Sequence, residues 1–339
     1  MGRKTDMALD RPIVCLGILV ADLVGRPVRA LPDPGRLILV DEMALHTGGC
    51  ALNTATGLAR LGLPVEVIGK VGADPLGDFL LRTMAGRGIG TRGVSRDPEV
   101  GTSATMVMVG PDGERRFVHY IGANAHLRLE EVDMGLVARA SILHVAGALV
   151  LPGLDGRPMA TLLQMARAAG VITFLDTVWD DTGRWMELLG PSLPHVDYFV
   201  PSLAEAQALT GLDDPEEVAR ALLDCGVGTV GLKMGAAGCL VVSGSGEQVR
   251  LPAFDVPVVD ATGAGDAFAA GFIAGAWLGW SLEGTARLAN AVGALCVTGT
   301  GASGNVRSLA ETLAFIESAK LKVQQDSPRA GDRPALPPI

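Results

Sequence analysis

The segment Val259-Asp-Ala-Thr-Gly-Ala-Gly-Asp266 leads directly into the apolar stretch AFAAGFIAGAWLG of residues 267–279. The small residues at 263–265 leave backbone N–H groups open at the start of a predicted helix. Those amides and the helix dipole form a site for an anion. The carboxylate of Asp266 falls in the first turn, where it would act as a general base for an alcohol beside a bound phosphate. An acidic residue at a helix start is also a common cap, so the spacing alone leaves both interpretations open.

A second glycine-rich stretch, Thr47-Gly-Gly-Cys-Ala-Leu-Asn53, opens another predicted helix. Paired glycines let a ligand approach the backbone closely. The Asn53 amide, about one turn into the helix, offers both a donor and an acceptor, which suits a polyhydroxylated ligand. On these residues alone, a tight turn followed by a surface asparagine is the simpler interpretation.

A third stretch, Gly299-Thr-Gly-Ala-Ser-Gly304, matches the pattern G-x-G-x-x-G. A dinucleotide site requires a preceding strand and an acidic residue about 20 positions later. Here a helical pattern precedes the glycines and Ala319 stands at the acidic position, so we reject a dinucleotide site. Carbonyl groups of this loop could hold a cation, or the loop could simply turn the chain.

Strand-like apolar runs alternate with helical patterns around these three stretches. The predicted strands are Ile13–Val20, Val65–Val71, Ile142–Val150, Val171–Asp176, Thr229–Lys233 and Gly238–Ser243. The predicted helices are Ala51–Leu61, Leu76–Gly86, Pro158–Ala169, Ser202–Thr210, Gly263–Leu278 and Leu282–Val297. In the helix at 202–210, Ser202 is the expected N-cap and Glu205 its capping-box partner. The alternation predicts a parallel, three-layer α/β fold.

Two stretches interrupt this alternation, residues 36–46 and residues 102–121. The second contains Gly110-Pro-Asp-Gly113, a strong turn signal between two strand-like runs. Neither stretch has room for a crossover helix, so we expect both to form one small extra sheet over the main domain. The last twenty residues contain four prolines among polar residues, which predicts a disordered tail.

The composition excludes several classes of protein. The 339 residues carry a formal net charge of −9, and aromatic residues make up only 4%. A nucleic-acid partner needs a basic field or aromatic stacking platforms, and an anionic membrane surface needs basic residues, so we expect neither partner. The longest apolar candidate, residues 267–280, is shorter than the roughly 20 residues of a membrane span. Five widely spaced cysteines without a C-x-x-C pattern indicate a reducing, cytoplasmic setting.

Taken together, these segments resemble the ribokinase-like (PfkB) family of carbohydrate kinases. The resemblance follows the family's order along the chain, through Gly17–Asp22, GGCALNTATGLARLG, VGADPLGDFL, Gly122–Asn124, KMGAAG and DATGAGDAFAAGF. It implies a three-layer α/β/α fold with a mostly parallel sheet and a small β-sheet lid. The kinase domain would span residues 11–320, with lid segments at about 23–46 and 100–124, and residues 321–339 would form the tail.

By this resemblance the protein transfers the γ-phosphate of ATP, with Mg²⁺, to a hydroxyl of a sugar or sugar-like substrate. Asp266 is then the catalytic base, and the amides of Gly263, Ala264 and Gly265 form the anion hole. Phosphoryl transfer depends mainly on positioning and on neutralising the transferring group, which agrees with an open helix start. The implied substrate contacts are Asp22, Gly48, Gly49, Asn53 and Asn124.

The resemblance also implies nucleotide and metal contacts. The nucleotide residues are Ser202, Glu205, Lys233, Gly235, Gly238 and Asn290, with Glu205 holding a Mg²⁺-bound water. A monovalent-cation site, which K⁺ would fill, is implied at Asp260, Thr262, Gly299, Gly301 and Asn305. The ordinary alternatives are a strand-end cap for Asp22, a solvated charge for Lys233 and a plain helix residue for Asn290.

The chain departs from the family pattern at several positions. Ser202 stands where the family often has Asn, which predicts weaker or water-mediated phosphate or metal contacts there. Ala261 replaces a common Thr, which matters less if backbone amides bind the phosphate. Val20 and Cys50 replace the Asn and Lys of ribokinase itself, so ribose is not the expected substrate.

The leading hypothesis is therefore an ATP-dependent sugar kinase whose sugar is not identified. A nucleoside kinase of the same fold is an alternative, although the sparse aromatic residues count against stacking of a base. A non-catalytic sugar- or nucleotide-binding regulator is another, which the retention of Asp266 and Glu205 opposes. Asp176, Trp179 and Asp180 are candidates for substrate contacts without a decisive pattern. We also expect a homodimer formed through the lid, because a small exposed sheet has edges to cover.

Overall fold

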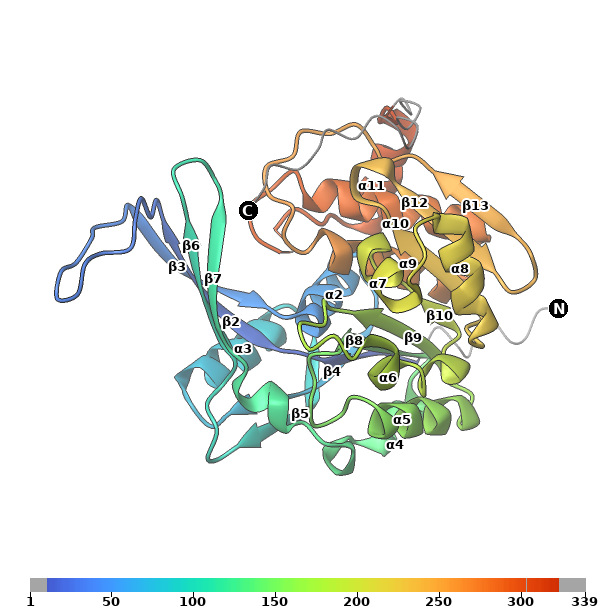
Figure 1. Cartoon of the computed structure of the whole chain (residues 1–339), viewed down its shortest axis with the longest axis horizontal. Coiled ribbons are helices and arrows are strands. Elements are labelled where there is room, and N and C mark those ends of the chain that lie inside the picture. Colours follow the sequence, from blue (N-terminus) through green and yellow to red (C-terminus); the bar gives the residue numbers. More distant parts are fainter. Residues whose placement is uncertain (1–10, 303, 323–339) are drawn as a thin grey trace.

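The structure, a computed structural model, describes residues 11–302 and 304–322. Figure 1 shows a large α/β body with a smaller sheet projecting from one side. The large sheet has nine strands: β1 (Ile13–Gly17), β4 (Val65–Gly72), β5 (Gly90–Asp97), β8 (Ile142–Ala148), β9 (Ile172–Thr177), β10 (Tyr198–Phe199), β11 (Thr229–Lys233), β12 (Cys239–Ser243) and β13 (Gln248–Leu251). Their spatial order is β13-β12-β11-β10-β9-β8-β1-β4-β5. Neighbours from β11 to β5 run parallel, and β12 and β13 add an antiparallel edge.

Helices connect these strands. They are α2 (Cys50–Arg60), α3 (Pro75–Gly86), α4 (Met134–Arg139), α5 (Arg157–Ala168), α6 (Trp185–Leu189), α7 (Leu203–Thr210), α8 (Pro215–Asp224), α9 (Ala264–Trp277), α10 (Leu282–Cys296) and α11 (Leu309–Ser318). Four short 3₁₀ turns are η1 (Gly122–His126), η2 (Leu129–Glu131), η3 (Leu193–His195) and η4 (Gly235–Ala237). Within the described ranges, no helix has the length and apolar character of a membrane span.

The interior strand β1, which lies between β8 and β4, illustrates why the large sheet is buried on both faces. Its sequence is apolar throughout, and all of its residues are buried. Ile13 and Cys15 belong to one hydrophobic cluster, whereas Val14 and Leu16 belong to the other. Successive side chains of a strand point to opposite faces, so a continuous apolar run is what a parallel strand covered on both sides requires.

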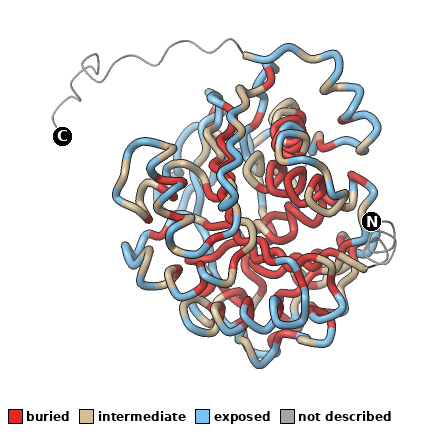
Figure 2. The backbone as a smooth tube through the Cα atoms, turned by 90° about the vertical axis from the view of Figure 1, so that its right-hand side faces the viewer, coloured by how far each residue is buried: buried red, intermediate tan, exposed pale blue. Residues whose placement is uncertain are grey.

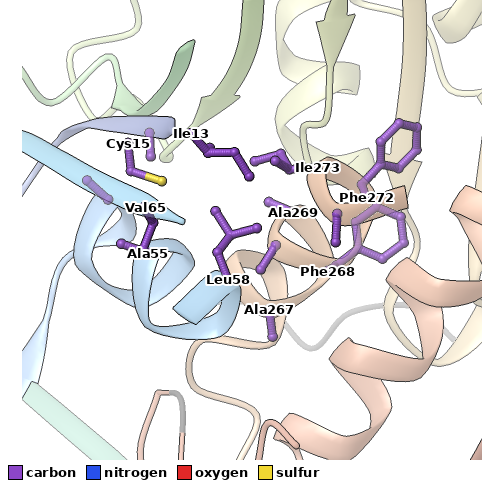
Figure 3. Close-up of a cluster of buried hydrophobic side chains, with 14 of the residues drawn as sticks. Ile13, Cys15, Ala55, Leu58, Val65, Ala267, Phe268, Ala269, Phe272 and Ile273 are labelled. Atoms are coloured by element: carbon purple, nitrogen blue, oxygen red, sulfur yellow. The ribbon is translucent and has the colours of Figure 1, made fainter. Parts of the chain in front are cut away.

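Two layers of helices provide this cover. Helices α2, α3, α9, α10 and α11 contribute to the first cluster, and α4 to α8 contribute to the second. Figure 2 shows the buried residues gathered in the sheet and the helix faces against it. Figure 3 shows the first cluster, where Leu58 of α2 lies beside Ala269 and Ile273 of α9. The three-layer α/β/α prediction is confirmed.

Helix α9 packs closely against its neighbours through small residues. A Cβ atom added to Gly271 would lie 2.8 Å from the Cα atom of Ala289 in α10. On another side, a Cβ atom added to Gly57 of α2 would lie 2.8 Å from the Cβ atom of Ala270. These contacts leave α9 little freedom to shift, and they therefore determine where its N-terminus lies.

The smaller sheet is the lid that the two interruptions of the pattern predict. Its strands are β2 (Val20–Arg26), β3 (Glu42–Gly48), β6 (Ala104–Val109) and β7 (Arg115–Tyr120), in the order β3-β2-β6-β7. The chain passes through the lid twice, first between β1 and α2 and again between β5 and η1. Both connections keep the lid beside the carboxyl end of the main sheet.

Some predicted boundaries are wrong. The predicted strand Ile13–Val20 ends at Gly17, because Val20 already belongs to the lid. Strand β5 was not predicted, since it is a half-exposed edge strand of polar sequence without an apolar run. The proposed tail lies, from residue 323 onwards, outside the described residues, and the domain limits 11–320 remain a prediction.

Replacing Gly271 by Ala should destabilise the protein, because the new Cβ atom would lie 2.8 Å from the Cα atom of Ala289. Overpacking of this kind costs about 1–3 kcal/mol of unfolding free energy. Gly86 of α3 is the matched control, because a Cβ atom there meets nothing within 4 Å. Gly86→Ala should be neutral or stabilising by up to about 1 kcal/mol. Urea unfolding measures both variants, and equal midpoints would contradict the tight α9–α10 contact.

Candidate active site

A cavity of about 650 Å³ lies between the inner face of the lid and the main sheet. Asp22 of the lid, Asn53 of α2 and Asp266 of α9 line it. Val150 and Val178, which follow the carboxyl ends of β8 and β9, form part of its floor. Ligands of open α/β sheets bind outside the carboxyl ends of the strands, so this cavity has the expected position of a functional site.

No side chain caps the start of α9. Gly263 has a φ angle of 73°, and a Cβ atom there would lie 1.9 Å from the carbonyl oxygen of Ala302, so only glycine fits. The Ala264 amide donates to the carbonyl of Ala261 at 3.2 Å. Among the described residues, the amides of Gly263 and Gly265 have no protein acceptor. The helix start thus leaves two of the three predicted amides open, and the anion hole at this position stays a prediction.

Asp266 lies in the first turn of α9 and is 9% exposed. The Nδ2 atom of Asn53 donates a 2.8 Å hydrogen bond to its Oδ2 atom. Burial raises the pKa of Asp266, and the bond from Asn53 works in the opposite direction. A carboxylate that holds a proton more strongly is a better general base. Sequence reasoning assigned Asn53 to the substrate, whereas its amide is directed at this carboxylate.

The other predicted substrate residues surround the same cavity. A Cβ atom at Gly48 would lie 2.0 Å from Oδ2 of Asp22, so the glycine leaves room for the carboxylate. Gly49 lines the cavity with a φ angle of 89°. Asn124 also lines it, but its amide binds the backbone of Leu19, accepting from N at 3.1 Å and donating to O at 3.0 Å. Asn124 therefore stabilises the cavity wall, because both polar atoms of its side-chain amide already bind the backbone of Leu19.

Polar residues form a row across the inner face of the lid. His46, Asp22, Thr105 and His119 stand opposite one another on β3, β2, β6 and β7, and all four line the cavity. The Oγ1 atom of Thr105 lies 3.0 Å from Nδ1 of His119. Burial raises the pKa of Asp22, against the influence of Thr105 and the two histidines. Sequence reasoning missed both histidines, because only the strand register brings them to Asp22.

The next row of the inner face is apolar. Ala44, Val24, Val107 and Phe117 stand opposite one another, and all line the cavity. The period-two alternation of lid side chains was the available signal for both rows. An acceptor in this cavity would therefore meet hydrogen-bonding groups near Asp22 and an apolar surface farther out on the lid.

A buried ion pair lies close to the start of α9. The Nζ atom of Lys233 is 2.8 and 2.7 Å from the two carboxylate oxygens of Asp176. Burial lowers the pKa of Lys233, but the carboxylates of Asp176, Glu205 and Asp266 outweigh burial and raise it. Nζ is only 3.3 Å from where a Cβ atom of Gly265 would stand. A charged ammonium group thus adjoins the open amides.

Ser202 and Glu205 form the predicted capping box at the start of α7. The Oε2 atom of Glu205 accepts from the Ser202 amide at 2.9 Å and from Oγ1 of Thr177 at 3.1 Å. Oε1 makes no hydrogen bond with the described residues. Within those residues, no group of three or more His, Cys, Asp or Glu side chains could hold a metal ion. Mg²⁺ keeps several waters and binds few carboxylates, so Glu205 fits a contact through water.

A second cavity, of about 250 Å³, lies on the other side of the α9 start. Four of the residues predicted for the nucleotide line it, namely Lys233, Gly235, Gly238 and Asn290. The Nδ2 atom of Asn290 donates to the carbonyl of Pro252 at 3.2 Å. Ser202 and Glu205 are not part of its lining.

The first turn of α9 separates the two cavities. Gly263 and Asp266 line the larger one, whereas Ala264 and Gly265 line the smaller one. Two ligands could therefore approach the same open amides from opposite sides, with the Asp266 carboxylate on one side only. This is the arrangement that transfer of a phosphoryl group between two bound molecules requires.

The segment before α9 carries Asp260, which is 6% exposed. Its Oδ1 atom accepts from the Thr262 amide at 2.8 Å and its Oδ2 atom from the Gly301 amide at 2.7 Å. The lid residue Arg115 forms an ion pair with Asp260 and donates to the hydroxyl of Thr262. Burial raises the pKa of Asp260, but these donors outweigh burial and lower it. Sequence reasoning missed Arg115.

The remaining residues of the predicted cation site lie in one turn after α10. A Cβ atom at Gly299 would lie 2.7 Å from the Cβ atom of Asn305, and the Asn305 amide donates to the Thr298 hydroxyl. Of the three further candidates for substrate contacts, Asp176 lies in β9 and pairs with Lys233, whereas Trp179 follows β9 and packs on Trp185. Asp180 accepts from the amides of residues 182 and 185.

Comparisons with known proteins agree with this geometry. The family described as "pfkB family carbohydrate kinase" matches residues 10–309. The ribokinase of Haemophilus influenzae is 29% identical over 321 residues, covering 92% of this chain and 100% of that protein. The 2-dehydro-3-deoxygluconokinase of Bacillus subtilis is 30% identical over 302 residues, covering 86% of this chain and 92% of that protein.

Comparison with solved structures shows that the fold is also similar. A candidate ribokinase II from E. coli, solved with ATP and Mg²⁺, superimposes with a TM-score of 0.79 at 25% identity. The match covers 91% of this chain and 99% of that chain. The three-layer body, the four-stranded lid and the sequence matches lead to one assignment. The chain belongs to the PfkB family of carbohydrate kinases.

Proposed function

We propose that this protein is an ATP-dependent kinase that phosphorylates a hydroxyl group of a sugar or sugar-like acceptor. The observation that carries the proposal is the pair of cavities on either side of the open start of α9. The larger cavity suits the acceptor, because the carboxylate of Asp22 lines it and can accept hydrogen bonds from sugar hydroxyls. The smaller cavity suits the nucleotide, because four of the six residues that resemble the family's nucleotide contacts line it.

In this proposal Asp266 removes the proton from the acceptor hydroxyl, and Asn53 orients its carboxylate. The open amides of Gly263 and Gly265 and the ammonium of Lys233 receive the transferring group. Bound Mg²⁺ would neutralise part of the charge on the triphosphate. The free Oε1 atom of Glu205 would hold one of its waters.

The acceptor itself is open to experiment. The row around Asp22 supports a polyol, and the apolar row with Phe117 supports an acceptor that also has an apolar part, such as a nucleoside. We would measure ATP consumption and thermal shifts over sugars, sugar acids, polyols and nucleosides. Turnover with a sugar or sugar acid supports the proposal, and turnover with nucleosides alone selects the nucleoside kinase. Tight binding without turnover of any acceptor would favour a non-catalytic regulator.

The setting of the enzyme is proposed on similar grounds. All five cysteines are free, which supports a reducing compartment. A cytoplasmic kinase would also have ATP at hand. The negative net charge is compatible with phosphate handling, because the positive groups are local to the start of α9.

Replacing Asp266 by Asn should abolish the base while it preserves the size of the side chain. Loss of a general base reduces turnover by about 10²–10⁴-fold. Affinity for the acceptor and for a non-hydrolysable ATP analogue should change little, as measured by calorimetry. Near-normal kcat in this variant would rule out Asp266 as the base.

Replacing Asn53 by Ala removes the 2.8 Å bond that stabilises the charged carboxylate of Asp266. The pKa of Asp266 should then rise further, because hydrogen bonds to the charged form lower a carboxyl pKa. The acidic limb of the kcat profile should therefore move to higher pH. Thr54→Val is the matched control, because Thr54 approaches only the backbone carbonyl of Asp266. If both variants keep the acidic limb of the wild-type kcat–pH profile, Asn53 does not lower the pKa of Asp266.

We also propose a homodimer formed through the outer face of the lid. Leu45, Leu23, Met106 and Val118 stand opposite one another there, and all are exposed. A contiguous exposed apolar row is typical of an association surface, and a second copy offers the same row.

Met106→Glu should convert the dimer into monomers, because a charge in an apolar interface is costly to desolvate. Met165→Glu is the matched control, since Met165 is similarly exposed but lies on α5. Size-exclusion chromatography with light scattering gives the mass. A monomeric wild type, or a dimeric Met106→Glu variant, would refute this interface.

A further inference from the structure

Arg115 connects the lid to the segment that precedes the anion hole. It is the first residue of β7, and its guanidinium pairs with Asp260 and donates to the Thr262 hydroxyl. It lines the larger cavity together with Gly263 and Asp266. The side chain of Arg115 is 27% exposed and that of Asp260 only 4%. A fixed positive charge therefore adjoins the start of α9.

Hydrogen-bond donors surround the carboxylate of Asp260 and compensate its negative charge. Two backbone amides, from Thr262 and Gly301, bind its two oxygens at 2.8 and 2.7 Å. The Arg115 guanidinium adds a charged partner, and Arg–carboxylate pairs are among the stronger hydrogen-bonded contacts. A buried carboxylate needs a counter-charge, and here the chain supplies that charge from its own lid.

A monovalent cation at the same carboxylate does not fit this arrangement. The cation would lie beside a guanidinium of the same sign in a partly buried site, where charges of like sign repel more strongly than in water. It would also compete with amides that already occupy the carboxylate oxygens. The residues around Asp260 therefore do not fit the K⁺ ion that the resemblance implies at this position.

We infer that Arg115 takes the place of a monovalent cation at Asp260 and acts as a positioning residue for the anion hole. The ion pair joins Arg115 of the lid with Asp260 of the loop before α9, which are far apart in the sequence. It can form only while β7 lies over the cavity. Closure of the lid and placement of the charge beside the anion hole are thus one event, and no dissolved monovalent cation is required for it.

The test compares salts of different cations at equal ionic strength. Wild type should melt at the same temperature, and bind a non-hydrolysable ATP analogue with the same affinity, in KCl and in tetramethylammonium chloride. Arg115→Met leaves Asp260 without its partner, so its analogue affinity should fall and become dependent on K⁺. Arg116→Met is the matched control, because Arg116 is the exposed neighbour on the same strand. Arg116→Met should behave as wild type. Arg115→Lys keeps the positive charge, so its affinity for the analogue should not depend on K⁺.

Three results would overturn the inference. One is tighter analogue binding or a higher melting temperature of wild type in KCl. The second is an Arg115→Met variant that matches Arg116→Met. The third is an Arg115→Met variant weakened equally in all salts, which would limit Arg115 to holding the lid. The analogue measurement rests on the proposed kinase function. If wild type binds no nucleotide and turns over no acceptor, that function fails, while melting in the two salts still decides the role of Arg115.

Discussion

The start of α9 has to keep amides unpaired at the walls of two cavities, and the rest of the molecule accommodates this requirement. Unpaired N–H groups are unfavourable wherever they are shielded from water, and a capping side chain would remove the problem together with the anion site. The fold instead leaves the start open and holds the helix body firmly. Gly57 of α2 packs closely on α9, and Gly271 of α9 packs closely on α10. These contacts leave no room for a Cβ atom, so they fix the position of α9. The site thus depends on packing well behind it.

Charges around this helix start are arranged in opposing pairs. Lys233 binds Asp176, Arg115 binds Asp260, and the Asn53 amide donates to the carboxylate of Asp266. The protein therefore places two cationic side chains beside the site where phosphate is proposed to bind, although each is paired with a carboxylate and the chain as a whole is acidic. Asp266 differs from the other two carboxylates because its hydrogen-bond partner is a neutral amide. Burial raises the pKa of Asp266 and also that of Asp176, to about 7, but of these two only Asp266 lines the larger cavity.

The lid has two faces with different tasks, and both follow from strand alternation. Its inner face presents the row around Asp22 and the apolar row with Phe117, so it shapes the acceptor cavity. Its outer face presents Leu23 and Met106 to solvent. Arg115 at the start of β7 adds a contact to the main body. One small sheet can thereby close the site, select the acceptor and offer a surface for association.

Much of the fold and part of the site could be predicted from the sequence, because these features are local. The apolar run of β1, the capping box of Ser202 and Glu205 and the glycines before Asp266 each express their preference within a few residues of chain. The bond from Asn53 to Asp266 spans 213 positions, and the contact of Arg115 with Thr262 spans 147. Nothing in the local sequence marks such pairs, and the row of His46, Asp22, Thr105 and His119 exists only through strand register. The sequence by itself determined which elements form and where an anion can bind, because backbone preferences and helix dipoles are short-ranged. Only the tertiary structure decided which side chains face that anion site, because long-range packing brings them together.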